Sequence, residues 1–232
     1  MCLLKLFNNS NIQSKVLEVK SLAEYIKEVS SYNGDVLLFR GQSNKDFRLI
    51  PSVGRNDKFL KYEKQMFLEF KRSYYLYADN RPMTDMDTLF LAQHYGLPTR
   101  LLDWSYNPLV ALYFACCNDL KIDGRVFIYK VPKQNNHVKE GHDLDNDIFS
   151  KTFEKEYLFI IPDYTDKRYV NQKGMFLWFK NPKKAFSDCF MTIIVKNKKA
   201  ILSNLCSIGV TESFIYPTLD HICSEIKSKI QK

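Results

Sequence analysis

The chain has 232 residues, of which 45% are hydrophobic and 14% aromatic, so one large domain or two small ones can enclose a sizeable core. No apolar run approaches the roughly 20 residues that cross a bilayer, and residues 1–7 lack the length and cleavage pattern of a signal peptide. The sequence therefore predicts a cytoplasmic protein that does not act with a membrane.

The formal net charge is +8, and most of the excess lies in the second half of the chain. Residues 1–120 hold 15 basic and 13 acidic side chains, a net of +2, whereas residues 121–232 hold 19 and 13, a net of +6. Such a surface favours polyanions and predicts nucleic acid as a partner. The alternative is a lysine-rich surface that is simply solvated, since no RNA- or DNA-binding motif is present. The excess includes Lys180, Lys183, Lys184, Lys196, Lys198 and Lys199.

Helical periodicity dominates the first half. Residues 14–30 are predicted to form an amphipathic helix, with Val19, Leu22, Ile26 and Val29 at helical spacing. The apolar run at 35–40 has the length of a strand. Further helices are predicted at 59–78, 85–95 and 108–119, the last of them with Pro108 in its first turn.

Strand composition dominates the second half. Strands are predicted at 125–129, 158–161, 175–179, 190–195 and 211–216, and a closing helix at 218–230. The polar residues 134–150 predict an exposed loop. We therefore expect a single α+β domain over residues 1–232, with a helical part to about 120 and a strand-rich part from about 121 around a mixed or antiparallel sheet.

The six cysteines suggest no metal site. Cys2, Cys116, Cys117, Cys189, Cys206 and Cys223 form no Cys-x-x-Cys pair, and no histidine stands at metal-ligand spacing. Cys116 and Cys117 fall on a predicted helix, where neighbouring side chains point apart. Buried free thiols are the expected state.

The most informative stretch runs from Gln93 to Ala115. It brings His94, Thr99, Arg100, Asp103 and many other polar residues into a turn-rich run that leads into an apolar helix. A plain core segment does not need so many polar side chains of different chemistry. His94 is either a pocket residue or a satisfied structural histidine, and Trp104 is either a core residue or a stacking platform. Asn107 and Pro108 begin the helix, whose N-terminus attracts anions.

A second candidate is Phe39-Arg40-Gly41-Gln42-Ser43, which ends an apolar strand. The guanidinium of Arg40 suits a bidentate grip on phosphate or carboxylate, and Gly41 leaves space for close approach. Gln42 and Ser43 can add neutral hydrogen bonds. The alternative is that Arg40 pairs with a carboxylate, most simply Asp103, to fix a loop.

A catalytic carboxylate is harder to choose. Glu212 lies in Gly209-Val210-Thr211-Glu212, at the start of a predicted strand, and projects either into a cleft or into solvent. No Gly-rich phosphate loop, His-Glu-x-x-His or Gly-x-Ser-x-Gly motif occurs, which argues against P-loop, zincin and α/β-hydrolase chemistry.

These motifs resemble the FRG domain family, which is named for the Phe-Arg-Gly that stands here at 39–41. The resemblance rests on residues 39–43, 49–52, Arg55, the stretch from Gln93 to Ala115, residues 172–176 and residues 209–212, and it covers roughly 20–225. The layout is similar, more distantly, to that of mono-ADP-ribosyltransferases that use NAD. Those enzymes place an Arg or His on a first strand, a Ser- or Thr-containing strand before an Ala-x-x-Phe helix, and a Glu on a later strand.

That similarity implies an ADP-ribosyltransferase fold with Arg40, Ser105 and Glu212 in catalytic roles. Here Asp103-Trp104-Ser105 stands where those enzymes have Ser-Thr-Ser. A carboxylate can stabilise the positive charge that develops on the ribose when the nicotinamide bond breaks. The residues implied to contact NAD are Arg40, Gly41, Gln42, Ser43, His94, Tyr95, Thr99, Arg100, Asp103, Trp104, Asn107, Phe114 and Gln172.

The leading hypothesis is therefore an NAD-dependent ADP-ribosyltransferase that acts as a toxin or anti-phage defence effector. Nucleic acid is the plausible acceptor, protein is the alternative, and an inhibitory antitoxin protein is an expected partner. A second hypothesis is a non-catalytic module that binds a nucleotide or nucleic acid. A third is a nuclease that uses His94 and Asp103.

Overall fold

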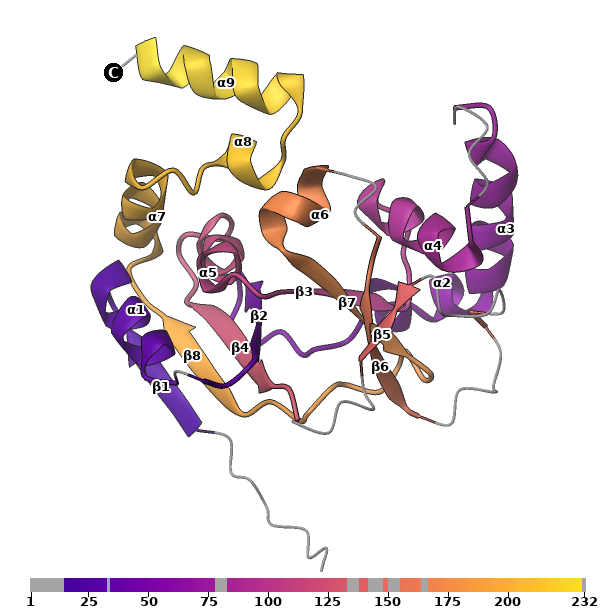
Figure 1. The fold of residues 1–232 in the computed structure, drawn as a ribbon, viewed down its shortest axis with the longest axis horizontal. Helices are drawn as coiled ribbons and strands as arrows, with labels where there is room; N and C mark the ends of the chain where they lie inside the picture. The colour runs from indigo at the N-terminus through magenta and orange to yellow at the C-terminus, as the bar shows by residue number, and fades with distance from the viewer. Residues whose placement is uncertain are drawn as a thin grey trace, which may run out of the picture.

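The computed structural model describes residues 15–32, 34–77, 83–132, 138–141, 148–149, 155–163 and 167–230. Within them, an α+β fold is built on one eight-stranded mixed sheet with the strand order β1-β8-β4-β2-β3-β7-β6-β5 (Figure 1). The predicted α+β class and mixed sheet are therefore confirmed. The strands are β1 (Lys15–Val19), β2 (Leu37–Gln42), β3 (Leu101–Ser105), β4 (Gly124–Lys130), β5 (Val138–Glu140), β6 (Tyr157–Ile161), β7 (Gly174–Phe179) and β8 (Met191–Val195).

The helices are α1 (Leu22–Ser30), α2 (Asp57–Lys61), α3 (Glu63–Tyr74), α4 (Asp85–His94), α5 (Pro108–Cys116), α6 (Lys167–Gln172), α7 (Lys198–Ser207), α8 (Glu212–Ile215) and α9 (Leu219–Ile230), with a 3-10 turn at Ser52–Arg55. In Figure 1, α5, α6, α8 and α9 lie above the strands, α1 and α7 at the left, and α2, α3 and α4 at the right. Among the described residues, no helix has both the length and the apolar character that crossing a bilayer requires.

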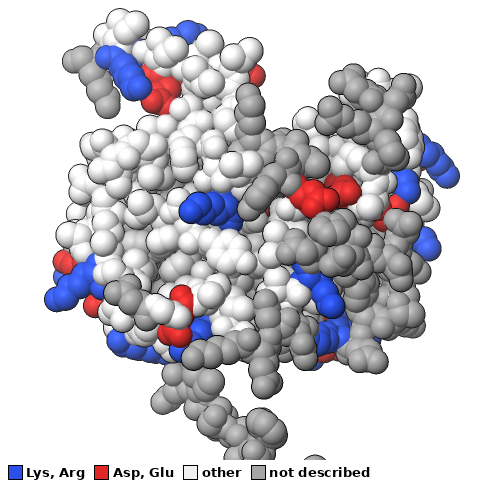
Figure 2. Space-filling view, in the orientation of Figure 1, with Lys and Arg blue, Asp and Glu red and all other residues white. Residues whose placement is uncertain are grey.

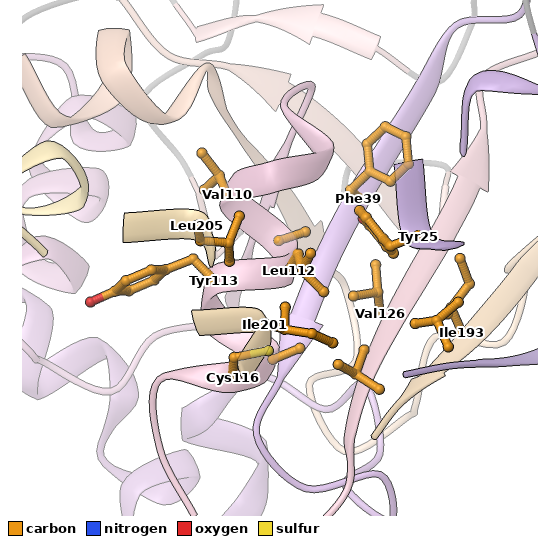
Figure 3. Packing of buried hydrophobic residues seen from close by; sticks show 14 of the residues in the cluster. Tyr25, Phe39, Val110, Leu112, Tyr113, Cys116, Val126, Ile193, Ile201 and Leu205 are labelled. Carbon is orange, nitrogen blue, oxygen red and sulfur yellow. The ribbon is translucent and has the colours of Figure 1, made fainter. Parts of the chain in front are cut away.

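Alternate residues of the central strands face two different cores. Phe39, Val126 and Ile128 pack with α5 and α7 on one face, whereas Leu38 and Phe127 pack on the other. Figure 3 shows the first core, in which Leu112 of α5 and Phe39 and Val126 of the strands belong to one cluster. This alternation has the period of two that a strand buried on both faces requires.

Glycine allows α5 to lie directly on the strands. A Cβ atom added at Gly41 would lie 1.8 Å from the carbonyl oxygen of Ala111, and one at Gly124 would lie 2.2 Å from that of Ala115. A Cβ atom does not approach a carbonyl oxygen so closely, so glycine at these two positions allows α5 to pack where it does. The packing of α5 therefore excludes a side chain at Gly41.

The sheet opens between β2 and β3. Strand β2 pairs with β4 from Leu37 to Gln42, and β3 pairs with β7 along its whole length. Between β2 and β3, the described residues show a single register pair, Phe39 with Ser105. The two strands diverge from that point, and this opening positions the site described below.

Two predicted elements were wrong in type. Residues 15–19 form β1, parallel to β8, and the helix begins only after Ser21, whose side chain accepts a hydrogen bond from the backbone N–H of Glu24 at 3.2 Å. Residues 212–215 form the helical turn α8 instead of a strand, because Thr211 caps the backbone N–H of Phe214 at 3.3 Å. Helical periodicity led to the wrong prediction for residues 15–19, and apolar composition led to the wrong prediction for residues 212–215.

Other differences are smaller. Part of the predicted loop at 134–150 forms β5, and Ile148 is buried. The predicted helix at 59–78 is divided at Tyr62 into α2 and α3. Cys116 and Cys189 are buried free thiols as expected, but Cys206 and Cys223 are exposed. Residues 1–7 and Cys2 lie outside the described residues.

Candidate functional site

A cavity of about 220 Å³ lies where β2 and β3 diverge. Its walls come from both strands, from α5 and α6, and from the residue after α8: Phe39, Arg40, Gly41, Asp103, Trp104, Ser105, Val110, Ala111, Phe114, Arg168, Gln172 and Tyr216. A smaller cavity of about 40 Å³ adjoins it and shares Asp103, Trp104, Arg168 and Gln172. The smaller one is also lined by Gln93 and His94. Segments far apart in the sequence therefore meet in one hollow.

Arg40 contributes a guanidinium at the opening between the strands. Its Nη1 donates to the backbone oxygen of Asp103 and lies 3.8 Å from the Oδ2 atom of that residue. The side chain is only 15% exposed, and its Nε is buried without a hydrogen-bond partner. Burial lowers the pKa of Arg40, and the carboxylate of Asp103 opposes that shift. Arginine stays charged throughout, so the cavity holds an incompletely satisfied cation.

Asp103 places a carboxylate in both cavities, and its side chain is 52% exposed. The Nε2 of Gln93 donates to its Oδ1 at 2.7 Å, and the Oε1 of Gln93 accepts from the hydroxyl of Thr99. Thr99 is itself buried, and its backbone N–H donates to Ser52 Oγ at 3.1 Å. Because the Thr99 hydroxyl fixes the direction of the Gln93 amide, this chain of hydrogen bonds orients Asp103.

Arg168 and Tyr216 form the wall opposite the strands. The guanidinium carbon of Arg168 lies 4.9 Å from the centre of the Tyr216 ring. Helix α6 is held against α8 by Asn171 Nδ2, which donates to Phe214 O at 3.0 Å, and by Gln172 Nε2, which donates to Ile215 O at 2.9 Å. Burial raises the pKa of Tyr216, so its hydroxyl stays protonated at neutral pH. These contacts bring a second cation and an aromatic ring into the cavity.

Ser105 and Asn107 hold the turn that joins β3 to α5. The hydroxyl of Ser105 donates to Gln172 O and accepts from the backbone N–H of Asn107 at 2.8 Å. Asn107 Oδ1 accepts from the backbone N–H of Leu109 at 3.0 Å and so caps α5. Ser105 lines the cavity, but its hydrogen-bonding groups are already engaged by the backbone.

The predicted aromatic residues differ in their surroundings. The Trp104 ring packs edge-on against Tyr129, Phe159 and Phe186 in the second core, and its Nε1 is buried without a partner. Phe114 lies in the cavity wall, with its ring centre 6.3 Å from that of Tyr216. Phe114 and Tyr216 thus add aromatic rings to the cavity wall beside Phe39 and Trp104, whose side chains also belong to the two cores.

Several predicted residues lie outside the larger cavity. Arg100 is buried, and its Nε donates to Glu63 Oε1 at 2.8 Å. Ser43 Oγ donates to Asp119 at 3.0 Å, and Gln42 is buried with its Oε1 unpartnered. Tyr95 is exposed on the surface beside His94, which lines only the smaller cavity.

Glu212 begins α8 and is not part of the walls of either cavity. Its side chain is 60% exposed, and its Oε1 lies 3.6 Å from His221 Nε2. Its backbone oxygen accepts from the backbone N–H of Tyr216 at 2.7 Å, which places it near that end of the larger cavity. The structure therefore brings together Arg40, Ser105 and Asp103, and leaves Glu212 outside.

The lysine excess is partly used within the fold. Lys198 is buried and donates to the backbone oxygens of Ser43, Asn118, Asp119 and Ile122. Lys183, Lys184 and Lys196 form ion pairs with Asp57, Glu156 and Asp123. On the face in Figure 2, basic and acidic side chains are dispersed rather than gathered in one patch. Among the described residues, no group of His, Cys, Asp and Glu side chains could hold a metal ion.

The sequence did not indicate three contributors to the site. They are Arg168, Tyr216 and Gln93, the last of which donates a hydrogen bond to Asp103. One signal could have found Arg168, because it precedes Gln172 by four residues and so shares a helix face with it. Tyr216 carries no such signal, since it reaches the cavity through the packing of α8 on α6.

Comparison with known proteins gives one match. Residues 35–124 match a family model described as the FRG domain. This stretch contains β2, β3 and α5, and with them the walls that carry Arg40, Asp103 and Phe114. Searches of curated proteins and of solved structures found no match. The predicted FRG resemblance is therefore confirmed over these residues.

Proposed function

We propose that the chain binds NAD at the opening between β2 and β3 and transfers its ADP-ribosyl group to an acceptor. The observation that carries the proposal is the meeting of Arg40, Arg168, Asp103 and Tyr216 in one cavity. Two guanidinium groups suit the two negative charges of a pyrophosphate or the hydroxyls of the adjoining ribose. The rings of Phe114 and Tyr216 suit the flat nicotinamide.

In the proposed reaction, the bond between nicotinamide nitrogen and ribose C1′ breaks. The electron pair leaves with nicotinamide, and the ribose gains positive charge. An acceptor oxygen or nitrogen then bonds to C1′ and loses its proton. A carboxylate beside C1′ lowers the barrier because it stabilises charge that exists only in the transition state.

We assign the carboxylate role to Asp103, because it faces the cavity and is oriented by Gln93. Glu212, which the ADP-ribosyltransferase similarity implies, is the alternative because it lies near Tyr216. Ser105 supports the wall rather than the ribose, since its hydroxyl is engaged by the backbone.

The cavity is smaller than most ligand pockets. Its volume of about 220 Å³ lies below the roughly 300–1,000 Å³ of typical ligand sites. We therefore place the reacting end, nicotinamide and its ribose, inside the cavity, and the adenosine end beyond the rim. The proposed acceptor is nucleic acid, supported by the net charge of +8, with protein as the alternative. A toxin or defence role and an inhibitory partner protein rest on the resemblance alone.

The test measures turnover of NAD carrying a label in its ADP-ribose part, with total RNA, DNA and protein as acceptors. Asp103→Asn should lower the rate by about 100-fold or more, as loss of a transition-state charge does. Glu212→Gln should stay within about twofold, as should the matched control Asp57→Asn, which removes an exposed carboxylate that lines neither cavity. Loss of activity in Glu212→Gln alone would transfer the role to Glu212.

A second candidate is a non-catalytic nucleotide-binding module. It is favoured by the size of the cavity and by the engagement of Asp103 with both Gln93 and Arg40. It predicts calorimetric binding of NAD or another nucleotide that Arg40→Ala abolishes, with no nicotinamide released. Absence of both binding and turnover would overturn the proposal and this alternative together.

A further inference from the structure

Helix α9 stands apart from the rest of the fold, at the upper left of Figures 1 and 2. Its neighbour is α8, and none of its residues is buried. A helix of 12 residues in water gains little from its own hydrogen bonds, so packing normally stabilises it. The side on which α9 is packed is therefore informative.

The side that contacts the rest of the chain is polar. His221 stacks on Tyr216, with ring centres 5.3 Å apart, and its Nδ1 lies 2.7 Å from Thr218 Oγ1. Glu225 accepts a hydrogen bond from Ser213 on α8. Its pKa is lowered to about 2 by Lys229, Ser213 and Thr211, which favour the charged form. Hydrogen bonds and one ring stack thus attach α9 to α8.

The apolar side faces solvent. Leu219, Ile222, Ile226 and Ile230 are between 41% and 81% exposed. Their spacing of three, four and four residues places them in one stripe, turned away from His221 and Glu225. A surface helix in a monomer normally shows the reverse arrangement, with the apolar stripe towards the core. The stripe is therefore a surface that a partner would cover.

The charges beside the stripe indicate which partner fits. Asp220 and Lys227 are seven residues apart, so they lie on the same flank of the stripe. Neither forms an ion pair with another described residue. When two such helices pair in opposite directions, the same flank of each helix meets the other. Asp220 of each copy then lies near Lys227 of the second copy, and symmetry provides this attraction twice.

We propose that α9 is a self-association surface, on which α9 of a second copy packs in antiparallel orientation. The four apolar residues form the seam, and the opposed helix dipoles also favour this direction. Twelve residues make a helix only about 18 Å long, so the interface is small and the association is weak and concentration-dependent. This inference is independent of the proposed enzymatic activity.

The first experiment follows dimer formation by sedimentation equilibrium over a range of chain concentrations. Reductant is included because Cys206 and Cys223 are exposed. Ile226→Asp should weaken association by about 30-fold or more, since it buries a charge in the seam. The matched control is Leu76→Asp, at an exposed apolar residue beyond α3, which should leave association unchanged. Equal loss in both variants would show non-specific association and overturn the proposal, as would a wild-type chain that stays monomeric.

The second experiment tests direction through charge reversal. Asp220→Lys and Lys227→Asp each replace two attractions with two repulsions and should weaken association by about tenfold. The double variant restores complementary charges across the antiparallel pair, so it should regain wild-type association. A double variant weakened as much as the product of the single effects would overturn the antiparallel arrangement. Helical circular dichroism and unfolding midpoints check that each variant is folded.

Discussion

The two ends of the short segment from Arg100 to Asp103 have opposite roles. At its start, Arg100 is buried and forms a two-pronged ion pair with Glu63, and its Nη1 donates to Phe179 O at 3.3 Å. Three residues later, Asp103 is half-exposed and faces the cavity. Both positions carry charged residues and both were predicted to contact a ligand. Residue type alone therefore does not separate a structural ion pair from a binding group.

The pairing of the strands explains the difference between these two positions. Arg100 precedes β3 and lies among α3, Phe149 and Trp178, where its charge is enclosed on all sides. Asp103 lies within β3 beside the opening, where its backbone oxygen accepts from Arg40 instead of from a β2 backbone N–H, and its side chain faces the cavity. A polar residue in this fold becomes available to a ligand where the sheet opens.

The largest expected effect comes from removing Arg100, at the structural end of this segment. Arg100→Ala leaves Glu63 buried without its cation and should lower the free energy of unfolding by about 3–5 kcal/mol. Asp103→Asn keeps the shape of a half-exposed side chain and should change it by less than about 1 kcal/mol. Urea denaturation of both variants measures the difference. Comparable losses in the two would show that Asp103 is also a structural residue.

The next effect concerns the opposite wall. Gly41→Ala forces a methyl group against the Ala111 carbonyl, so α5 must move, at a cost of about 1–3 kcal/mol in unfolding free energy. Because α5 carries Phe114, ligand affinity should fall as well. Gly96→Ala is the matched control: its φ of +88° brings strain of about 1 kcal/mol, but no atom lies near the new methyl. Thermal unfolding and nucleotide titration of both variants test this. Unchanged affinity in Gly41→Ala would show that the position of α5 does not affect ligand binding.

Much of the fold was predictable because its signals are local. The strand at 35–40, the helices at 85–95 and 108–119 and the strands at 158–161, 175–179 and 190–195 are all present with small shifts. The errors at 15–19 and 211–216 occurred where a single capping residue, Ser21 or Thr211, decided the structure. Strand β3 was missed because its polar residues had been interpreted as a loop.

The candidate site was predictable in part. Arg40 and Asp103 were identified because charged residues stood beside turn signals, and the structure brings them into one cavity. Arg168 and Tyr216 could not be identified in this way, since their positions depend on how α6 packs on α8. The opening of the sheet is likewise a property of strand order, and no short motif encodes it.

The smallest expected effect tests whether Ser105 is a structural residue, like Arg100, or contacts the ligand, as proposed for Asp103. Ser105→Ala removes the hydroxyl that joins Gln172 O to the backbone N–H of Asn107, and should lower the free energy of unfolding by about 1 kcal/mol. If the hydroxyl only supports the turn, NAD turnover below the unfolding temperature stays within about threefold of wild type. If it instead contacts the ribose in the transition state, kcat falls by about tenfold or more while the stability loss is unchanged. Steady-state kinetics and urea denaturation of the same sample give both values, and only the first outcome places Ser105 with Arg100 among the residues that build the site without touching the ligand.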